Sequence, residues 1–196
     1  MGLLIFDREL LRQRRRRNLS VFREYDFLIR RAEDEISDRL DVILREFPSV
    51  LCIGGSPENG FANQPKAGSV VCYDDCSEYL DMYGKAGVTG DLEALPFEAG
   101  CFDLVVSPLS LVFVNDLPGT LLQINQILKP DGLFIGVFAG GQTLKELREC
   151  FSLAEEELEG GVSPRVAPFL DVRDGGALLQ RAGFALPVAD SEIVTV

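Results

Sequence analysis

The chain has 196 residues, which is enough for one domain with a sizeable hydrophobic core. Hydrophobic residues make up 46% and charged residues 26%, as is usual for a globular protein, and no apolar run is long enough to cross a membrane. The net charge of −12 argues against nucleic acid as a partner. Histidine is absent, which excludes His-based metal sites and Ser-His or Cys-His nucleophile pairs; no metal site is expected.

The charge is distributed unevenly along the chain. Residues 1–45 contain 11 Arg and 9 acidic residues, whereas acidic residues dominate the remainder. The run Arg14–Arg17 is typical of a solvated helix face, and binding to an acidic partner or an anionic surface is the alternative. The first 18 residues have neither the apolar core of a signal peptide nor the acid-poor composition of a mitochondrial presequence, which predicts a cytoplasmic protein.

The hydrophobic pattern predicts alternating strands and helices in chain order. Apolar residues at three- and four-residue steps predict one long amphipathic helix from about residue 20 to 46, ended by Pro48. Short apolar runs stopped by turn residues predict strands at 49–53, 70–73, 87–90, 102–106 and 133–138, and a last strand at 185–196. Further helices are predicted at 77–85 and 117–128, at 143–159 behind a Thr143–Glu146 capping box, and at 171–181 with Gly183 as its stop.

This order of elements predicts the fold class. The strands are continuous apolar runs, as in a parallel sheet that is covered on both faces. We therefore expect an α/β protein with a Rossmann-like, doubly wound, mostly parallel sheet. Residues 1–46 are expected to form an N-terminal helical extension, and residues 47–196 a single α/β domain.

Ligands of such a sheet bind beyond the carboxyl ends of the strands. The glycine turn Gly54-Gly55-Ser56 lets the backbone approach a ligand, although an ordinary strand-to-helix turn has the same composition. Asp74, or alternatively Asp75, follows twenty residues later, where an acid can accept hydrogen bonds from both ribose hydroxyls or can be a solvated turn residue. Asp91 lies beside an apolar slot at Leu92 in which an adenine could lie, although Asp also caps turns.

The strand at 102–106 leads into a further candidate loop. Asp103 is expected to anchor the start of the strand, and Ser107 to face the group that reacts. No catalytic residue is assigned by this pattern.

Several segments together resemble the type-11 class I S-adenosylmethionine-dependent methyltransferases. They are residues 91–97, 102–111, 114–118 and 127–132. Segments 143–148, 163–169 and 181–184, with Phe6-Asp7-Arg8, Phe27-Leu28 and Asp38-Arg39-Leu40 near the start, make the chain similar to the family of the mitochondrial complex I assembly factor and its bacterial relatives. The malonyl-carrier-protein methyltransferase of biotin synthesis is a more distant likeness.

The resemblance implies a cofactor and places residues around it. S-adenosylmethionine would lie with its methionine part over Gly54 and Gly55, its ribose at Asp74, and its adenine at Asp91 and Leu92. Ser107 and Leu109 would border the sulfonium, and Leu109 and Phe113 would face the substrate.

The chain departs from the family pattern at three places. Cys52 stands where the first motif has an acid, and Ser56 and Glu58 stand where it has glycines. A non-glycine in the left-handed conformation costs about 1–2 kcal/mol, so cofactor binding is expected to be weakened. Val112-Phe113 replaces a His-Trp pair, and the chain stops at Val196, which predicts an open sheet edge that a partner or a second copy of the chain completes.

Two functions follow from these features. The first is a methyltransferase acting on a protein or small-acid substrate, with a respiratory-complex subunit as a candidate partner; the family also includes members associated with arginine hydroxylation. The second is a catalytically inactive scaffold or assembly factor on the same fold. A nicotinamide-binding oxidoreductase is disfavoured because no G-x-G-x-x-G follows the first strand.

Overall fold

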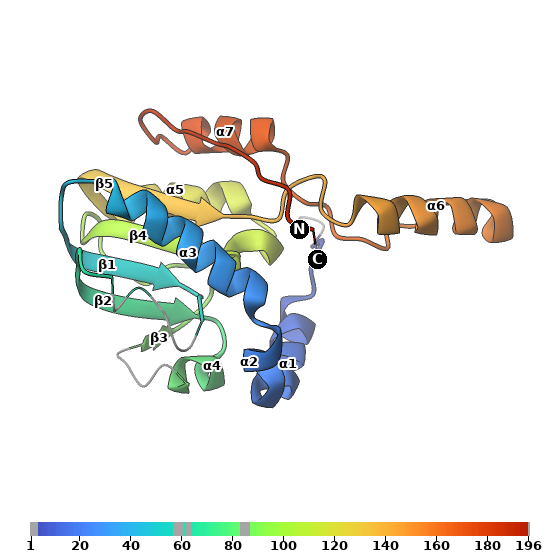
Figure 1. Cartoon of the computed structure of the whole chain (residues 1–196), viewed down its shortest axis with the longest axis horizontal. Helices are drawn as coiled ribbons and strands as arrows, with labels where there is room; N and C mark the ends of the chain where they lie inside the picture. Colours follow the sequence, from blue (N-terminus) through green and yellow to red (C-terminus); the bar gives the residue numbers. More distant parts are fainter. Residues whose placement is uncertain (1–3, 57–60, 62–63, 83–86, 196) are drawn as a thin grey trace.

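A five-stranded parallel sheet forms the centre of the molecule (Figure 1). The computed structural model describes residues 4–56, 61, 64–82 and 87–195. The strands are β1 (Phe47–Ile53), β2 (Ala67–Asp74), β3 (Gly87–Thr89), β4 (Phe102–Pro108) and β5 (Leu128–Val137), in the order β3-β2-β1-β4-β5. The predicted α/β class with a parallel sheet is confirmed, and β5 begins earlier than expected, at Leu128.

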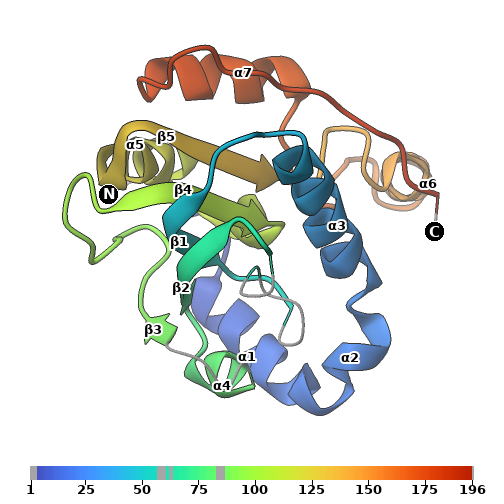
Figure 2. The same ribbon diagram turned by 60° about the vertical axis from the view of Figure 1, so that its left-hand side comes forward.

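Helices cover both faces of the sheet, which explains why its strands are continuous apolar runs. On one face, α3 (Phe27–Asp41) packs Ile36 and Leu40 against Val50 of β1. On the other face, α5 (Leu117–Ile127) packs against the alternate residues of the strands, and α7 (Val172–Arg181) borders the same cluster. Figure 2 shows α3 and α5 on either side of the strands.

Asp103 anchors the base of β4, as the sequence predicts. Its Oδ2 accepts a hydrogen bond from Ser49 N at 2.9 Å and forms an ion pair with Lys129 Nζ at 2.8 Å. The carboxylate therefore joins β1, β4 and β5 at the edge of the sheet opposite the predicted site.

The N-terminal part consists of several short helices. They are α1 (Arg8–Asn18), the 3-10 turn η1 (Leu19–Val21), α2 (Phe22–Tyr25) and α3. The single helix predicted over residues 20–46 is wrong because Asp26 interrupts it and α3 ends at Asp41. The buried Asp26 accepts a hydrogen bond from Arg30 at 2.8 Å instead of continuing a regular turn.

Two further helices differ in how much they bury. The short α4 (Ser77–Asp81) buries Tyr79 and Leu80, whereas α6 (Lys145–Glu159) extends away from the body of the protein and buries only Glu155 (Figure 1). The capping box predicted at Thr143–Glu146 is wrong: α6 begins after Leu144, which has a φ of 53° and makes no side-chain cap. Gly183, with a φ of 89°, follows α7 as predicted.

The strand predicted at 185–196 is wrong, because the described residues 185–195 form no strand. Pro187 has no N–H for a strand ladder, and the segment is held to α3 by side chains instead. Arg31 contacts Glu192 at 2.6 Å, and Arg39 contacts Asp190 at 3.2 Å. In the described part of the sheet, β5 is consequently an outer strand. None of the described helices is long and apolar enough to span a membrane.

Candidate functional site

The predicted site residues lie where β1, β2 and β4 end and where the chain follows β3. Because the strands are parallel, all these positions meet at one edge of the sheet. The first of them, the turn after β1, approaches the second directly: a Cβ atom added to Gly54 would lie 3.8 Å from Asp74 Oδ2. The structure therefore brings together the glycine turn and the acid that the sequence placed there.

The turn needs both of its glycines. Gly54 has a φ of 73° and Gly55 a φ of 102°. A Cβ atom on Gly54 would lie 1.7 Å from the hydroxyl oxygen of Ser110, so the turn is also closed against the loop after β4. Among the described residues, Ser56 is not one of those with positive φ, and the expected strain of a left-handed serine is therefore wrong. Glu58 lies outside the described residues.

Cys52 is completely buried below this turn. Its thiol donates a hydrogen bond to the Gly54 carbonyl at 3.2 Å, and burial raises the pKa of the thiol well above its ordinary value. Cys52 is thus a neutral donor at the position where the family pattern has an acid.

Asp74 and Asp75 at the end of β2 are held by an arginine from α1. The Arg15 guanidinium makes two hydrogen bonds of 2.8 Å to the two oxygens of Asp74 and one of 2.7 Å to Asp75. Burial alone would lower the pKa of Arg15, but the carboxylates raise it above its ordinary value. Asp74 Oδ1 also accepts the N–H of Cys76 at 2.8 Å. Burial raises the pKa of Asp75 despite the nearby Arg15.

Asp91 is held in the same way by Arg8, which binds its Oδ1 and also Glu93 at 3.2 Å. Burial works in the opposite direction, but the hydrogen bonds from Glu93 N and Arg8 lower the pKa of Asp91. The sequence predicts that Leu92 lines an apolar slot for an adenine, but in the structure Leu92 is buried in the core. Tyr73 supports this loop through a 2.7 Å hydrogen bond from its hydroxyl to the Asp91 carbonyl.

Helix α1 therefore lies across the carboxyl ends of β2 and β3, and Figure 1 shows it on the side of the sheet toward which the strand arrows point. The sequence signal for it was the Arg14–Arg17 run, for which a solvated face was the favoured interpretation. Arg15 instead contacts Asp74 and Asp75, and Arg16 contacts Glu78 at 3.0 Å, all within the same chain. The sequence did not predict these contacts, because the spacing of the arginines does not show which acidic residues they approach.

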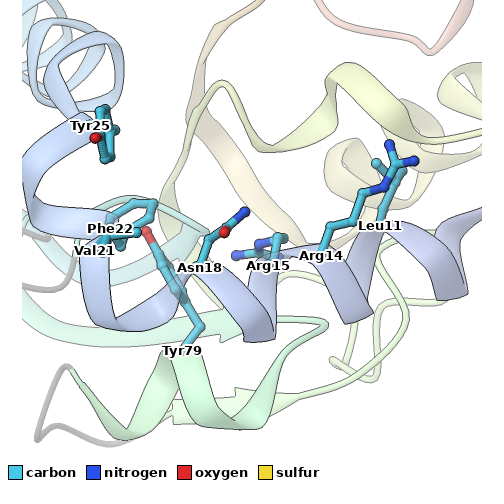
Figure 3. A pocket seen from close by; sticks show the side chains of 8 residues that line it. All are labelled: Leu11, Arg14, Arg15, Asn18, Val21, Phe22, Tyr25 and Tyr79. Atoms are coloured by element: carbon cyan, nitrogen blue, oxygen red, sulfur yellow. The ribbon is translucent and has the colours of Figure 1, made fainter.

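Aromatic contacts anchor α1 and α2 on α4. The Arg15 guanidinium lies 4.7 Å from the centre of the Tyr79 ring, and Phe22 makes an edge contact with that ring at 5.0 Å. An open cavity of about 480 Å³ lies beside them (Figure 3). Its walls are Leu11, Arg14, Arg15, Asn18, Val21, Phe22, Tyr25 and Tyr79. The cavity borders the contact of α1 and α2 with α4.

Ser107, predicted near the sulfonium, lies in β4, and Leu109 and Phe113, predicted to face the substrate, lie in the segment that follows it. Ser107 is fully buried, and its hydroxyl is among the buried polar atoms of the described residues that lack a hydrogen-bond partner. Leu109 has a φ of 63°, a left-handed conformation that is uncommon for leucine. Phe113, at the end of the 3-10 turn η2 (Ser110–Phe113), is partly exposed and makes an edge contact with Phe6 at 5.4 Å.

The N-terminal segment is fixed to this loop by Asn115. The Asn115 Oδ1 atom accepts hydrogen bonds from the N–H groups of Ile5 and Phe6 at 2.9 and 2.8 Å. A second cavity, of about 250 Å³, opens here between residues 5–6, residues 111–117 and residues 168–171. Its mostly apolar lining differs from the acidic surroundings of Arg15 at the end of β2. No group of three or more potential metal-binding acids, cysteines or histidines occurs in the described part of the chain.

The comparisons with known proteins agree with this fold. Residues 40–136 match the sequence model of the type-11 methyltransferases, described as a methyltransferase domain. The protein named arginine-hydroxylase NDUFAF5, mitochondrial, is 41% identical in Mus musculus, covering 100% of this chain and 60% of that protein, and 38% identical in Danio rerio, covering 100% and 64%. The malonyl-[acyl-carrier protein] O-methyltransferase of Gallionella capsiferriformans is 39% identical over 56% of this chain and 36% of that protein.

Solved structures show the same fold at low sequence identity. A SAM-dependent methyltransferase of Thermotoga maritima has a TM-score of 0.63 at 18% identity, covering 87% of this chain and 80% of that one. The YcgJ protein of Bacillus subtilis has a TM-score of 0.59 at 16% identity, covering 80% and 69%. The chain spans about 60% of the length of the curated mammalian relatives that it matches. Residues 40–136 therefore form a type-11 methyltransferase domain, and the chain has the fold of the class I methyltransferases.

Proposed function

We propose that this chain binds S-adenosylmethionine at the carboxyl ends of β1 to β4 and transfers its methyl group to a protein or small-acid substrate. The observation that carries the proposal is the left-handed Gly54-Gly55 turn beside the buried Asp74 carboxylate. A turn without side chains next to a buried acid suits a ligand that combines an amino acid with a ribose.

The residues present fit this cofactor. The Gly54-Gly55 turn presents backbone and no side chain of its own to the methionine part, Asp74 can accept hydrogen bonds from the ribose, and Asp91 can accept one from the adenine amino group. The Ser107 hydroxyl, which has no described partner, offers a further polar contact. The bound cofactor supplies an electrophilic methyl group, and the protein contributes by holding the acceptor in line with it. Leu92 supports the Asp91 loop from the core.

Binding of the nucleoside requires a change at α1. Arg15 already occupies an acceptor position on each oxygen of Asp74, and Arg8 occupies one on Asp91. A ribose that takes both oxygens of Asp74 competes with the Arg15 guanidinium. We therefore propose that α1 acts as a lid whose arginine contacts are exchanged for ligand contacts.

Calorimetric titration of S-adenosylmethionine and S-adenosylhomocysteine into the purified chain tests the cofactor. Binding at micromolar concentrations supports the proposal, and no heat at millimolar ligand contradicts it. A titration of NADH in parallel tests the nicotinamide alternative, which predicts that NADH binds and that S-adenosylmethionine does not.

Arginine hydroxylation is a second candidate, favoured by 41% identity over the whole chain to a protein named as an arginine-hydroxylase. Arginine-containing peptides from respiratory-complex subunits, incubated with the chain and either S-adenosylmethionine or molecular oxygen with a two-electron reductant, distinguish the two reactions by mass spectrometry. A gain of one methyl group indicates methylation, and a gain of one oxygen atom indicates hydroxylation. If the chain binds such a subunit stably but changes no mass, the scaffold or assembly-factor function is supported instead.

The cellular location of the chain and its association with other chains are open to experiment. The sequence predicts a cytoplasmic location, whereas the relatives carry the word mitochondrial in their names; fractionation of cells that express the chain decides between them. The outer strand β5 is the edge at which we propose that a second copy or a protein partner binds.

A further inference from the structure

The carboxylate of Glu33 lies against the glycine turn, although Glu33 belongs to α3 and was not among the predicted site residues. Glu33 Oε1 accepts the N–H of Ser56 at 2.5 Å, and its Oε2 accepts the Ser56 hydroxyl at 2.8 Å. The residue is only 4% exposed, and burial raises its pKa. A buried carboxylate is costly unless it is hydrogen-bonded, so its placement at this turn requires a reason.

The Glu33 carboxylate lies close to the side chain at position 52, where the family pattern has an acid. A Cβ atom added to Gly55 would lie 2.9 Å from Glu33 Oε1 and 3.3 Å from Cys52 Sγ. The side chains of Glu33 and Cys52 therefore converge on the same point below the turn. The family pattern has an acid at position 52, and the cysteine there cannot act as a carboxylate.

We propose that Glu33 supplies from α3 the carboxylate that position 52 lacks, and that it positions the Gly54–Ser56 turn for cofactor binding. Ser56 is part of this replacement, because its hydroxyl donates a second hydrogen bond to the Glu33 carboxylate, which a glycine at this position would not provide. Cys52 and Ser56, which look like losses in the sequence, are then two parts of one replacement. The part of this inference that concerns cofactor binding rests on the proposed function.

The charge of Glu33 gives the inference a consequence for the ligand. S-adenosylmethionine carries a positively charged sulfonium and a positively charged ammonium group. A carboxylate that is shielded from water below the turn attracts such charges more strongly than an exposed one does. Glu33 therefore contributes to affinity through its charge and not only through the shape of the turn.

The variant Glu33→Gln separates charge from shape. A glutamine can accept the Ser56 N–H with its oxygen and donate to the Ser56 hydroxyl, so the turn retains its contacts. We expect S-adenosylmethionine to bind at least about tenfold more weakly, which corresponds to about 1.4 kcal/mol. Asp34→Asn, on the exposed side of the same helix, is the matched control and leaves affinity unchanged. Equal affinity of wild type and Glu33→Gln would overturn the role of the charge.

A transfer experiment tests the replacement itself without any ligand. Cys52→Asp alone places two carboxylates at one buried point, and Glu33→Ala alone removes the partner of Ser56. We expect each change to lower Tm by at least about 3 °C, the shift that about 1 kcal/mol produces at this chain length. The double variant, with one carboxylate again at the turn, should lie closer to the wild type than either single variant. Additive losses would overturn the inference.

The two experiments fail in different ways. If the wild type binds neither S-adenosylmethionine nor S-adenosylhomocysteine, the proposed function is wrong and so is the role of Glu33 in cofactor binding. The Tm values of the wild type, the two single variants and the double variant then still decide whether Glu33 replaces the acid. If the wild type binds but the double variant recovers neither Tm nor affinity, Glu33 is not the replacement and the proposed function stands.

Discussion

At the scale of single residues, the candidate site is a set of acids, with Asp74 and Glu33 buried and Asp91 exposed, whose charges are matched by hydrogen bonds. Asp74 illustrates this: it is 1% exposed and bound by both Arg15 and the N–H of Cys76. The Cys76 N–H continues to fix the direction of this carboxylate when a ligand takes the place of Arg15. A fixed acceptor loses little freedom when it binds a ribose, which favours affinity.

We expect Asp74→Asn to weaken S-adenosylmethionine binding. The amide replaces one acceptor oxygen by a donor, so the ribose loses a charged acceptor and affinity falls by at least about tenfold. Calorimetry on this variant checks the result, with Asp81→Asn on the exposed side of α4 as the control. Binding equal to that of the wild type would remove Asp74 from the site.

Glu33 also makes stability depend on pH. Its pKa is raised in the folded protein by burial, so folding is favoured when it is protonated. This contribution is fully present below the ordinary value of 4.5 and is lost as the pH rises through the raised folded value. We therefore expect Glu33→Gln to gain free energy of unfolding relative to the wild type as the pH rises from 4.5 to the raised folded value. Urea titrations at several pH values measure the difference; a constant difference would contradict the expected shift.

At the scale of elements, the sequence predicted the sheet better than its surroundings. Apolar runs such as Val70–Tyr73 and Phe102–Val106 become strands because burial on both faces leaves them no other arrangement. The break at Asp26, the absence of a strand after Ala185 and the contact of Arg15 with Asp74 depend on residues distant in the chain. No local pattern contains that information, and the site was therefore predicted only in its strand-end loops.

Helix α1 carries a prediction of its own. Replacing Arg15 by Gln removes the cation that competes for Asp74, so S-adenosylmethionine should bind roughly three- to tenfold more tightly. That range corresponds to about 1 kcal/mol for a partly exposed ion pair. The same change leaves Asp74 without its partner in the ligand-free protein, and Tm without ligand should fall.

Paired titrations and thermal melts of Arg15→Gln check both effects. Arg14→Gln, the exposed neighbour on the same helix, is the control. Weaker binding by Arg15→Gln would mean that the guanidinium supports the ligand, and α1 would then not be a competing lid.

At the scale of the whole molecule, stability is distributed unevenly. Helix α5 buries Thr120, Leu121, Ile124 and Ile127 against the sheet, whereas α6 has 15 residues and buries only Glu155. A helix of this length without packing is marginally stable in water. The Glu155 contact with Arg165 and with Ser163 N at 2.7 Å ties the helix to the following loop and not to the core.

Hydrogen exchange should therefore separate these two helices. Amides of α6 are expected to exchange by local opening, orders of magnitude faster than those of α5, which require unfolding of the core. Glu155→Gln should speed exchange in α6 further and leave α5 unchanged, because it weakens the attachment to Arg165 without touching the sheet. Exchange of α6 at the rate of α5 would show that the helix is covered in solution. A protection that grows with protein concentration would then identify a second copy as the cover, since only association depends on concentration.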